Sequence, residues 1–315
     1  MELIRGLHNL PSEWRPDYRG CVATIGAFDG VHRGHQRVIS QLLERARELA
    51  LPSVVILFEP LPREFLTPED APARLMSFRE KFAALAELGV DRLLCIRFSQ
   101  ALRSMSAQTF IHRILVAGLG VRHIMLGDDF RFGNDRQGDT AFIHQQGQLH
   151  GYTCAAMPTV EYDGERISST RIRKALAAAD FGLAQVLLGR PYSIGGKVVY
   201  GRQLGRTLGA PTANVDLHRL RSPLAGVYAV RVDAAQLSAA PGVASIGTRP
   251  TIAEGMQANL EVHLIDRCCV LYGQRIKVTF LHKLREELKF DSIAEMGDQI
   301  GRDIANARDW LASDA

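Results

Sequence analysis

Two histidines three residues apart, His32 and His35, have the types and spacing for phosphate chemistry. They end the segment G-A-F-D-G-V-H-R-G-H, residues 26–35, which follows a short apolar run. Because the first N–H groups of a helix have no partner within it, a strand followed by a glycine-rich turn and a helix start forms an anion site. Histidines at positions i and i+3 share one helix face and can both reach one phosphate. The segment therefore predicts a nucleotide-binding site.

A second helix start is rich in hydroxyl groups, in I-S-S-T-R-I-R at residues 167–173. A serine N-cap alone would explain Ser168 or Ser169. Alternatively, the same hydroxyl and N–H groups hold the β- and γ-phosphates of a nucleotide, and Arg173 adds positive charge one turn later. We favour the second interpretation because H-x-G-H after a strand is a signature of nucleotidylyl-transferring enzymes.

A third segment is glycine-rich and ends in Pro211-Thr212-Ala213-Asn214. A Walker A loop requires Gly-Lys-Ser/Thr after its spacer, but the nearest candidate, from Gly196 to Gly201, continues with Arg and Gln. The hydroxyl of Thr212 and the amide of Asn214 lie two residues apart and project to one side of an extended segment. Hard oxygen donors of this kind suit Mg²⁺ and phosphate.

Length and composition set the remaining bounds. A chain of 315 residues is long for one core, so two domains are expected. The net charge of +4 is spread without blocks of like charge, which disfavours a nucleic-acid face. The longest apolar stretch is too short for a membrane span, and the N-terminus lacks a signal-peptide pattern. Five scattered cysteines without C-x-x-C spacing indicate reduced thiols and a cytoplasmic protein.

Strand and helix patterns alternate in the first half, which predicts an α/β domain with a parallel sheet. The predicted strands are Cys21–Ile25, Ser53–Phe58, Arg92–Arg97, His123–Leu126 and Tyr152–Met157. The predicted helices are Gln36–Leu49, Ser77–Glu87 and Ala107–Val116. Ligands of such sheets bind at the carboxyl ends of the strands. The glycine–histidine turn and the loop Leu126–Gly133 should therefore converge there.

After a predicted helix over Ser169–Leu188, the sequence no longer alternates between strand and helix patterns. Short β-rich runs without intervening helices predict an antiparallel barrel or sandwich. These runs are Tyr192–Tyr200, Gly226–Val232, Gly242–Ile246, Ala258–Ile265 and Arg275–Leu281. A final helix, Ser292–Leu311, is expected to present one apolar face, formed by Ile293, Met296, Ile300, Ile304, Ala307 and Leu311. The domain boundary is predicted near residue 187, giving domains 1–187 and 188–315.

The first-half motifs, in this order and spacing, resemble the adenylyltransferase half of the bacterial bifunctional riboflavin kinase/FAD synthetase family. That resemblance implies a Rossmann-like nucleotidylyltransferase fold and transfer of AMP from ATP to FMN. It implies that ATP is contacted by Gly26, Phe28, His32, Gly34 and His35, and its pyrophosphate by Ser169, Thr170 and Arg173. It also implies that Asp129, Phe130 and Phe132 face the flavin. Simple core packing is an equally good interpretation of the two phenylalanines.

The second-half motifs resemble the riboflavin kinase half of the same family, which implies an antiparallel barrel with a terminal helix. The resemblance implies that Gly196, Gly201 and Gly205 cover ATP and that Thr212 and Asn214 carry its Mg²⁺. It makes Glu261 the catalytic base for the riboflavin hydroxyl and places Arg285 beside the flavin. From pattern alone, a solvent-facing glutamate is the better interpretation of Glu261. Ala27, Leu61 and Ser245 depart from residues common in the family.

Together these features predict one polypeptide with two ATP- and Mg²⁺-dependent activities, riboflavin to FMN and FMN to FAD. One alternative is a single nucleotidylyltransferase acting on another phosphorylated metabolite. Another is a non-enzymatic nucleotide- or RNA-binding protein, which the balanced charge and the lack of an aromatic platform disfavour. The expected partners are small molecules, with no nucleic acid or membrane, for a monomer or weak homo-oligomer.

Overall fold

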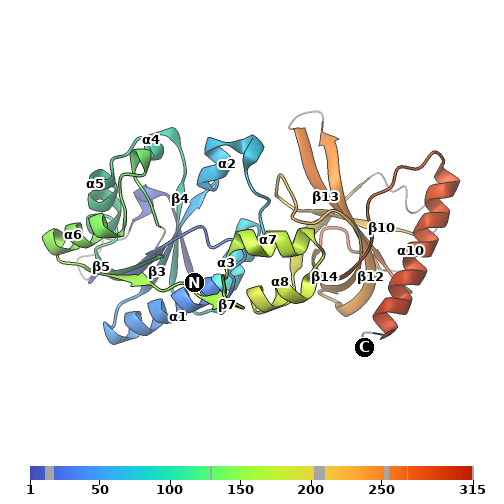
Figure 1. Cartoon of the computed structure of the whole chain (residues 1–315), viewed down its shortest axis with the longest axis horizontal. Helices are drawn as coiled ribbons and strands as arrows, with labels where there is room; N and C mark the ends of the chain where they lie inside the picture. The colour runs from blue at the N-terminus through green and yellow to red at the C-terminus, as the bar shows by residue number, and fades with distance from the viewer. Residues whose placement is uncertain (11–17, 128–129, 202–209, 252–254, 268, 314–315) are drawn as a thin grey trace. The chain divides into compact units, whose positions relative to one another are not determined.

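The chain folds into two compact units. The computed structural model describes residues 1–10, 18–127, 130–201, 210–251, 255–267 and 269–313 (Figure 1). One unit comprises Met1–Pro72 and Lys81–Ile167, and the other comprises Ala73–Glu80 and Ser168–Ala315. The expected boundary after residue 187 concerns the division of activities and stays a prediction.

The first unit contains a six-stranded sheet in the order β1-β4-β3-β2-β5-β6, with every pairing parallel. Its strands are β1 (Glu2–Arg5), β2 (Cys21–Ile25), β3 (Ser53–Glu59), β4 (Arg92–Arg97), β5 (Val121–Gly127) and β6 (Thr153–Met157). The predicted parallel sheet is confirmed, and only the edge strand β1 was not expected. Because β2 and β5 are neighbours in a parallel pair, their carboxyl ends lie side by side.

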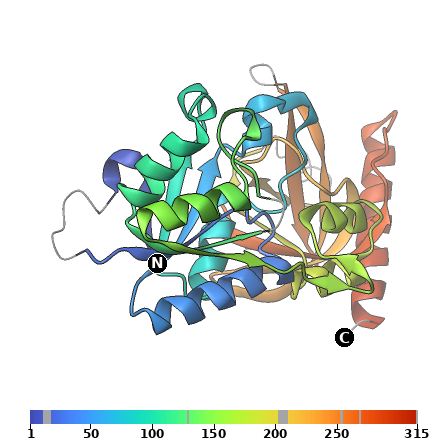
Figure 2. The ribbon, with the colours of Figure 1, turned by 60° about the vertical axis from the view of Figure 1, so that its left-hand side comes forward.

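Helices cover both faces of this sheet, α1 on one face and α5 and α6 on the other (Figures 1 and 2). The helical segments are α1 (Arg33–Glu48), α2 (Pro62–Leu66), α3 (Phe78–Glu87), α4 (Gln100–Arg103), α5 (Ala107–Phe110), the π-helical η4 (Ile111–Val116) and α6 (Thr140–His150), with short 3₁₀ turns η1 (Leu7–Asn9), η3 (Pro68–Asp70) and η5 (Asn134–Arg136). Alternate residues Cys21, Ala23 and Ile25 of β2 pack in one cluster with Ile111 and Ile114 of η4. The sequence did not predict α6.

A small hairpin, β7 (Glu161–Tyr162) with β8 (Glu165–Arg166), precedes the second unit in the chain.

The second unit contains a closed antiparallel barrel in the order β10-β13-β12-β11-β14-β9. Its strands are β9 (Ser193–Val199), β10 (Thr212–Asp216), β11 (Gly226–Ala234), β12 (Leu237–Thr251), β13 (Gly255–Leu264) and β14 (Arg275–Arg285). Of the two architectures expected, the barrel is the one found. The sequence did not predict β10, the strand that carries Thr212 and Asn214.

The terminal helix α10 (Ile293–Ser313) packs on the barrel through Ala307 and Leu311, which cluster with Val227 and Ala229 of β11. The predicted apolar face was wrong at its start, because Ile293 is 67% exposed. A carboxylate that sequence reasoning assigned to no face, Asp303, is instead buried. It forms an ion pair with Arg285 of β14, which compensates the burial of its charge.

The expected helix Ser169–Leu188 was also wrong, since the structure has two helices there, α7 (Ser169–Ala177) and α8 (Phe181–Leu188). Ala179 adopts a left-handed conformation, φ 57°, which ends the first helix. The Asp180 carboxylate then accepts a hydrogen bond from the Leu183 N–H at 2.9 Å and caps the second helix. Alanine-rich composition favours helix only weakly, and this cap overrides it.

A segment from early in the chain, Ala73–Glu80, belongs to the barrel unit through a buried polar cluster. The Arg219 side chain is fully buried and forms an ion pair with the Glu80 carboxylate. It also donates to the Leu75 carbonyl oxygen and the Tyr192 hydroxyl, each at 3.3 Å. Glu80 accepts a second bond from the Gly195 N–H of β9, at 2.7 Å. These bonds give the buried guanidinium an opposite charge and partners for its two terminal nitrogens, and they join the segment to the barrel strands.

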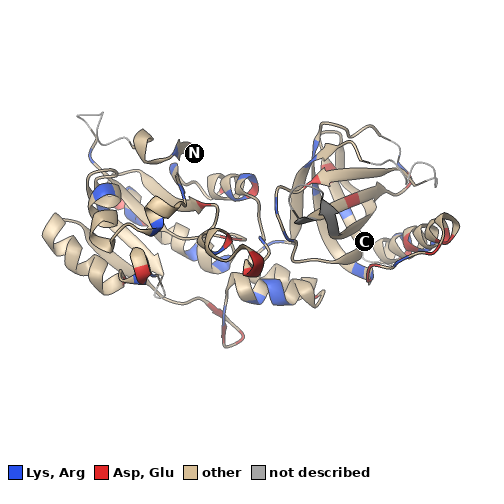
Figure 3. Ribbon diagram, turned by 90° about the horizontal axis from the view of Figure 1, so that it is seen from above, with Lys and Arg blue, Asp and Glu red and all other residues tan. Residues whose placement is uncertain are grey.

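Residues of both charges occur along the helices in Figure 3. Acidic and basic residues both occur along α10, for example Asp298, Arg302, Arg308 and Asp309 (Figure 3). Across the described ranges, no helix is both long and apolar enough to cross a membrane.

Candidate active sites

The structure brings His32 and His35 into direct contact at the start of α1. His32 is the N-cap, and its Nδ1 accepts a hydrogen bond from the His35 backbone N–H at 3.3 Å. The two rings stack with centroids 3.6 Å apart. A side chain at Gly34 would bring its Cβ within 3.1 Å of the His32 ring, so the glycine leaves room for the stack. The helix start therefore presents two imidazoles on one face.

Of the two histidines, His35 has the more unusual environment. Its Nδ1 is buried and has no hydrogen-bond partner among the described residues. Burial, then the nearby His32, Lys81 and Arg166, hold the pKa of His35 well below its ordinary value of 6.5. The ring is therefore neutral at neutral pH. A buried ring nitrogen without a partner is where an oxygen of a bound molecule would be expected.

The turn before these histidines holds two strained residues. Phe28 and Val31 have φ values of 47° and 40°, a region that costs a non-glycine residue about 1–3 kcal/mol. Phe28 is buried, and its ring lies 5.0 Å from the His35 ring. At the start of the turn, the Gly26 N–H donates to the Ile56 carbonyl oxygen at 3.2 Å. The Lys81 ammonium donates to the Ala27 carbonyl oxygen at 2.7 Å. The turn is thus tied to β3 and to α3.

The predicted pyrophosphate residues lie on α7, in the second unit. Ser168 is the N-cap, and its hydroxyl accepts from the Arg171 N–H at 3.2 Å. The capping interpretation therefore accounts for Ser168 and leaves Ser169 and Thr170 in the first helical turn. Arg173 donates through Nε to the Ala73 carbonyl oxygen. The expected sharing of one ATP between this helix and the two histidines stays a prediction.

A cavity of about 300 Å³ opens in the first unit, where β3, β4 and β5 end. Phe130 and Phe132 line it with their rings stacked at 5.5 Å. Phe132 is only 7% exposed and also belongs to the core, so its two interpretations are compatible. The cavity is lined by Phe58, Pro62, Leu66, Phe98, Leu102, Arg103, Phe110, Phe130, Arg131, Phe132, Gly133, Asp135 and Arg136. Asp129 lies outside the described residues.

Sequence reasoning missed most of this lining. Phe58 lies at the end of β3 and Phe98 lies just after β4. Their places at the carboxyl ends of predicted strands could have indicated that they line a ligand site. It also missed the three arginines at the cavity, Arg103, Arg131 and Arg136. Apolar walls edged by guanidinium groups suit a flat aromatic molecule that carries a phosphate.

In the barrel, the structure brings Asn214 and Glu261 together. They lie directly opposite each other in the β10–β13 pair, and Ser245 of β12 lies opposite Glu261 on its other side. Directly opposed residues of antiparallel strands share a face. Leu260 and Val262 are buried inside, so half-buried Glu261 lies on the outer face of the barrel. The predicted metal ligand and the predicted base are therefore neighbours.

Glu261 is held in place by Asn259, two residues earlier on the same strand. The Asn259 amide donates to a carboxylate oxygen of Glu261 at 3.1 Å. Sequence reasoning missed Asn259, although residues at i and i+2 of a strand always share a face. Glu261 lies on the outer face, as the solvent-facing interpretation expects, but it is half-buried and hydrogen-bonded, and its role as the catalytic base stays a prediction.

The glycines of the second unit have different surroundings. A Cβ at Gly201 would lie 2.2 Å from the Asn214 amide nitrogen, so the glycine allows the backbone to approach Asn214 closely. Gly196 is a barrel residue that pairs with Ile276 across β9 and β14. Gly205 lies outside the described residues. Close backbone approach beside an oxygen donor is consistent with a phosphate-covering segment.

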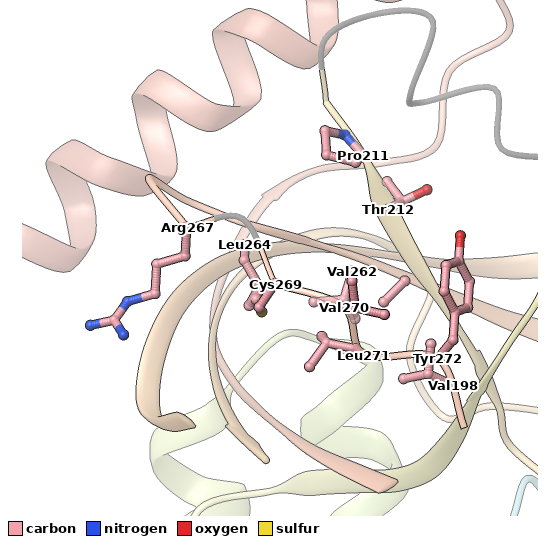
Figure 4. Close-up of a pocket in the computed structure, with 11 residues that line it drawn as sticks. Val198, Pro211, Thr212, Val262, Leu264, Arg267, Cys269, Val270, Leu271 and Tyr272 are labelled. Carbon is pink, nitrogen blue, oxygen red and sulfur yellow. The ribbon is translucent and has the colours of Figure 1, made fainter. Parts of the chain in front are cut away.

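A second cavity of about 300 Å³ adjoins Thr212. Figure 4 shows mainly apolar side chains around it, with Thr212 and the Tyr272 ring on the same side (Figure 4). It is lined by Val198, Pro211, Thr212, Ala213, Val262, Leu264, Arg267, Cys269, Val270, Leu271 and Tyr272. Tyr272 stacks on Tyr200 with ring centroids 4.2 Å apart. Apart from Pro211, Thr212 and Ala213, sequence reasoning assigned none of this lining to a site, because the lining comes from distant segments.

Arg285, the predicted flavin neighbour, is held by α10. Its guanidinium donates to both Asp303 carboxylate oxygens, through Nε at 2.9 Å and a terminal nitrogen at 2.6 Å. The Phe290 ring lies 5.9 Å from the same guanidinium. This explains why Asp303 is buried on α10, and the role of Arg285 toward a flavin stays a prediction.

Comparisons with known proteins cover both units. The sequence model of FAD synthetases matches residues 15–171, and that of riboflavin kinases matches residues 188–311. A solved structure from Streptococcus pneumoniae, named as a macrolide-efflux protein, is 31% identical with a TM-score of 0.78, covering 98% of this chain and 100% of its own.

Two curated relatives carry one name, bifunctional riboflavin kinase/FMN adenylyltransferase. The protein from Pseudomonas fluorescens is 56% identical over 315 residues, which is 100% of this chain and 99% of the relative. The protein from Escherichia coli K12 is 48% identical over 311 residues, 99% of this chain and 98% of the relative. With matches to both units over nearly its whole length, the chain belongs to the bifunctional riboflavin kinase/FMN adenylyltransferase family.

Proposed function

We propose that the two activities of this family are carried out at two separate sites, FMN adenylylation beside His32 and His35 and riboflavin phosphorylation beside Glu261 and Asn214. The chain is a riboflavin kinase and an FMN adenylyltransferase. ATP is a substrate, and FMN and FAD are products. The observation that carries the first site is the buried, unpartnered Nδ1 of His35 beside the cap formed by His32. The opposed pair Asn214 and Glu261 carries the second.

In adenylylation, an oxygen of the FMN phosphate attacks the α-phosphorus of ATP, and the bond to the leaving pyrophosphate breaks. His32 accepts at Nδ1, so its neutral ring carries the proton on Nε2 and can donate to a phosphate oxygen. His35, with its proton on Nδ1, would donate to a second oxygen. Both donors stabilise charge that develops on the transferred group. Ser169, Thr170 and Arg173 are proposed to bind the pyrophosphate, as the resemblance implies.

The cavity at the ends of β3, β4 and β5 is the proposed FMN site. Its phenylalanines would contact the isoalloxazine ring, and Arg103, Arg131 and Arg136 would attract the phosphate. The site lies at the carboxyl edge of the parallel sheet, the same edge from which the histidine turn leaves β2. This location supports binding of FMN and ATP at one edge of the sheet.

In riboflavin phosphorylation, the 5′-hydroxyl of riboflavin attacks the γ-phosphorus of ATP and ADP leaves. Glu261 would take the hydroxyl proton, with its carboxylate oriented by the amide of Asn259. The apolar cavity beside Thr212 is proposed to hold the adenine ring. Gly201, close to Asn214, would let the backbone lie over the phosphates.

Mg²⁺ fits the residues beside this site. Thr212 and Asn214 offer hard oxygen donors from one face of β10. The described residues contain no cluster of three or more His, Cys, Asp or Glu side chains that could hold a metal. That is compatible with Mg²⁺, which binds largely through substrate phosphates and needs few protein ligands. When bound, the ion would neutralise charge on the phosphates of ATP.

We further propose a cytoplasmic monomer or weak homo-oligomer whose ligands are small molecules. Free cysteines support a reducing compartment, because Cys21, Cys95, Cys154 and Cys269 are all free thiols. The mixed charge along surface helices supports the absence of a nucleic-acid face.

The test is a chromatographic time course with riboflavin, ATP and Mg²⁺. We expect FMN to appear before FAD in the natural protein. His32→Ala should stop at FMN, whereas Glu261→Ala should form no FMN from riboflavin yet still convert supplied FMN to FAD. Equal loss of both activities in each variant would refute two separate sites.

A further inference from the structure

Lys81 is a buried cation that neither proposed reaction uses. It is the single lysine in residues 1–173, where every other basic side chain is arginine or histidine. Lys81 lies in the first turns of α3, and only 1% of its surface is exposed. Burying an ammonium group is unfavourable unless it is hydrogen-bonded. Its bond to the Ala27 carbonyl oxygen, at 2.7 Å, is one such interaction.

The carbonyl that Lys81 holds lies in the strained turn before α1. Ala27 directly precedes Phe28, whose φ is 47°. Such a conformation persists only where its surroundings hold it. The Phe28 ring in turn lies 5.0 Å from His35, which stacks on His32 at 3.6 Å. A continuous series of contacts therefore runs from Lys81 through the turn to both imidazoles.

We propose that Lys81 is a positioning residue for adenylyl transfer: its ammonium group holds the Ala27 carbonyl and thereby fixes the turn that places Phe28 against His35. The inference rests on the proposed role of His32 and His35. A lysine suits this task because its long stem crosses the apolar interior and its head only donates. Methionine has a similar shape but cannot donate, so it would fill the space and leave the carbonyl unheld.

Lys81 also acts on His35 through its charge. The groups that face His35 are His32 at the start of α1, Lys81 on α3 and Arg166 on β8, and all three disfavour its protonation. Removing the ammonium charge should therefore raise the pKa of His35 toward its ordinary value. A residue that merely filled space would leave that pKa unchanged when replaced by methionine.

The experiment compares Lys81→Met with Lys277→Met, an exposed lysine of β14 given the same substitution. Adenylyl transfer from ATP to supplied FMN and phosphorylation of riboflavin are measured on the same full-length preparations. Because the kinase residues lie in the other unit, kinase activity reports the folding of that unit, and the NMR spectrum of the nucleotide-free protein reports the folding of the first unit. The titration of His35 is followed by NMR on histidine-labelled, nucleotide-free protein, with its signal assigned from His35→Gln.

We expect Lys81→Met to lower kcat/KM for adenylyl transfer by about 10²-fold, the loss typical of misplaced catalytic groups. Riboflavin phosphorylation should stay within about twofold, and the pKa of His35 should rise. Lys277→Met should change none of these.

Adenylyl transfer within twofold of the natural protein in Lys81→Met, with His35→Gln inactive, would overturn the role of Lys81 alone. Full activity in both variants would overturn the proposed role of His35 as well. Parallel loss of both activities in Lys81→Met would show a general folding role and also overturn the inference.

Discussion

The Nδ1 atom of His32 accepts the backbone N–H of His35 at 3.3 Å, so one imidazole both caps α1 and faces the other histidine. This bond assigns the acceptor role to Nδ1 and leaves Nε2–H as the donor of the neutral ring. The N-cap role and the phosphate-donor role therefore belong to different ring nitrogens. A substitution can remove the second while keeping the first.

His32→Asn and His32→Ala should separate these two roles. Asparagine is a good N-cap, so His32→Asn should keep the natural free energy of unfolding, while His32→Ala should lose about 0.5–2 kcal/mol. Both should lower kcat for adenylyl transfer by about 10²–10³-fold, as expected for loss of one donor to the transition state. Denaturant unfolding and a chromatographic assay measure the two effects. Full adenylyl transfer by His32→Asn would show that the ring is a cap only.

The stability of the nucleotide-free protein should fall in mild acid because of His35. The folded protein holds the pKa of His35 well below its ordinary value of 6.5, whereas the unfolded chain restores that value. Below pH 6.5 the unfolded state therefore binds a proton that the folded state does not. The free energy of unfolding should decrease by at most about 1.4 kcal/mol per pH unit over that window. His35→Gln should flatten this slope, and an identical slope in the variant would contradict the account.

Glu80→Gln should destabilise the barrel unit strongly. It would leave the fully buried Arg219 guanidinium without its opposite charge, which typically lowers the free energy of unfolding by about 3–5 kcal/mol. Asp266→Asn is the matched control, since its ion pair with Arg308 is exposed and worth at most about 1 kcal/mol. Equal effects of the two substitutions on denaturant unfolding would show that the buried cluster does not stabilise this unit.

Local patterns predicted the strand and the helix that carry His32 and His35, but they could not predict pairing between distant parts of the chain. Cys21–Ile25 and the helix after it were found from a short apolar run and a glycine turn, features a few residues long. Glu80 and Lys81, in contrast, lie within the predicted helix Ser77–Glu87, where no local pattern marks either residue as buried. Their burial depends on Arg219, 139 residues away, and on Ala27, 54 residues away.

The same reasoning explains the errors in the helices. The break between α7 and α8 depends on one alanine with positive φ and on the Asp180 cap, neither of which interrupts the apolar pattern. From the sequence, Asp303 is an ordinary polar residue of α10, because its burial depends on its hydrogen bonds with Arg285 of β14. The barrel site was predicted only through the family resemblance, because Asn214 and Glu261 become neighbours only through the pairing of β10 with β13.

Phe130→Ala should mainly affect FMN binding, whereas Phe132→Ala should mainly affect stability. Phe132 belongs to the core, so its truncation should lower the free energy of unfolding by about 3–5 kcal/mol. Phe130 is only partly buried and lines the cavity, so its truncation should mainly raise KM for FMN in adenylyl transfer. Thermal unfolding and steady-state kinetics distinguish these effects. An unchanged KM for FMN in Phe130→Ala would remove this residue from the proposed flavin site.

The central claim is that one chain makes FMN at the barrel and FAD at the histidine turn, at separate sites. It is tested most directly by mixing His32→Asn with Glu261→Gln and supplying riboflavin, ATP and Mg²⁺. We predict that either variant alone makes FAD from riboflavin at least about 10²-fold more slowly than the natural protein. The mixture should make FAD after a lag, because FMN released by the first variant is adenylylated by the second. A mixture that forms FMN but no FAD, or either variant alone forming FAD from riboflavin as fast as the mixture, would contradict the account.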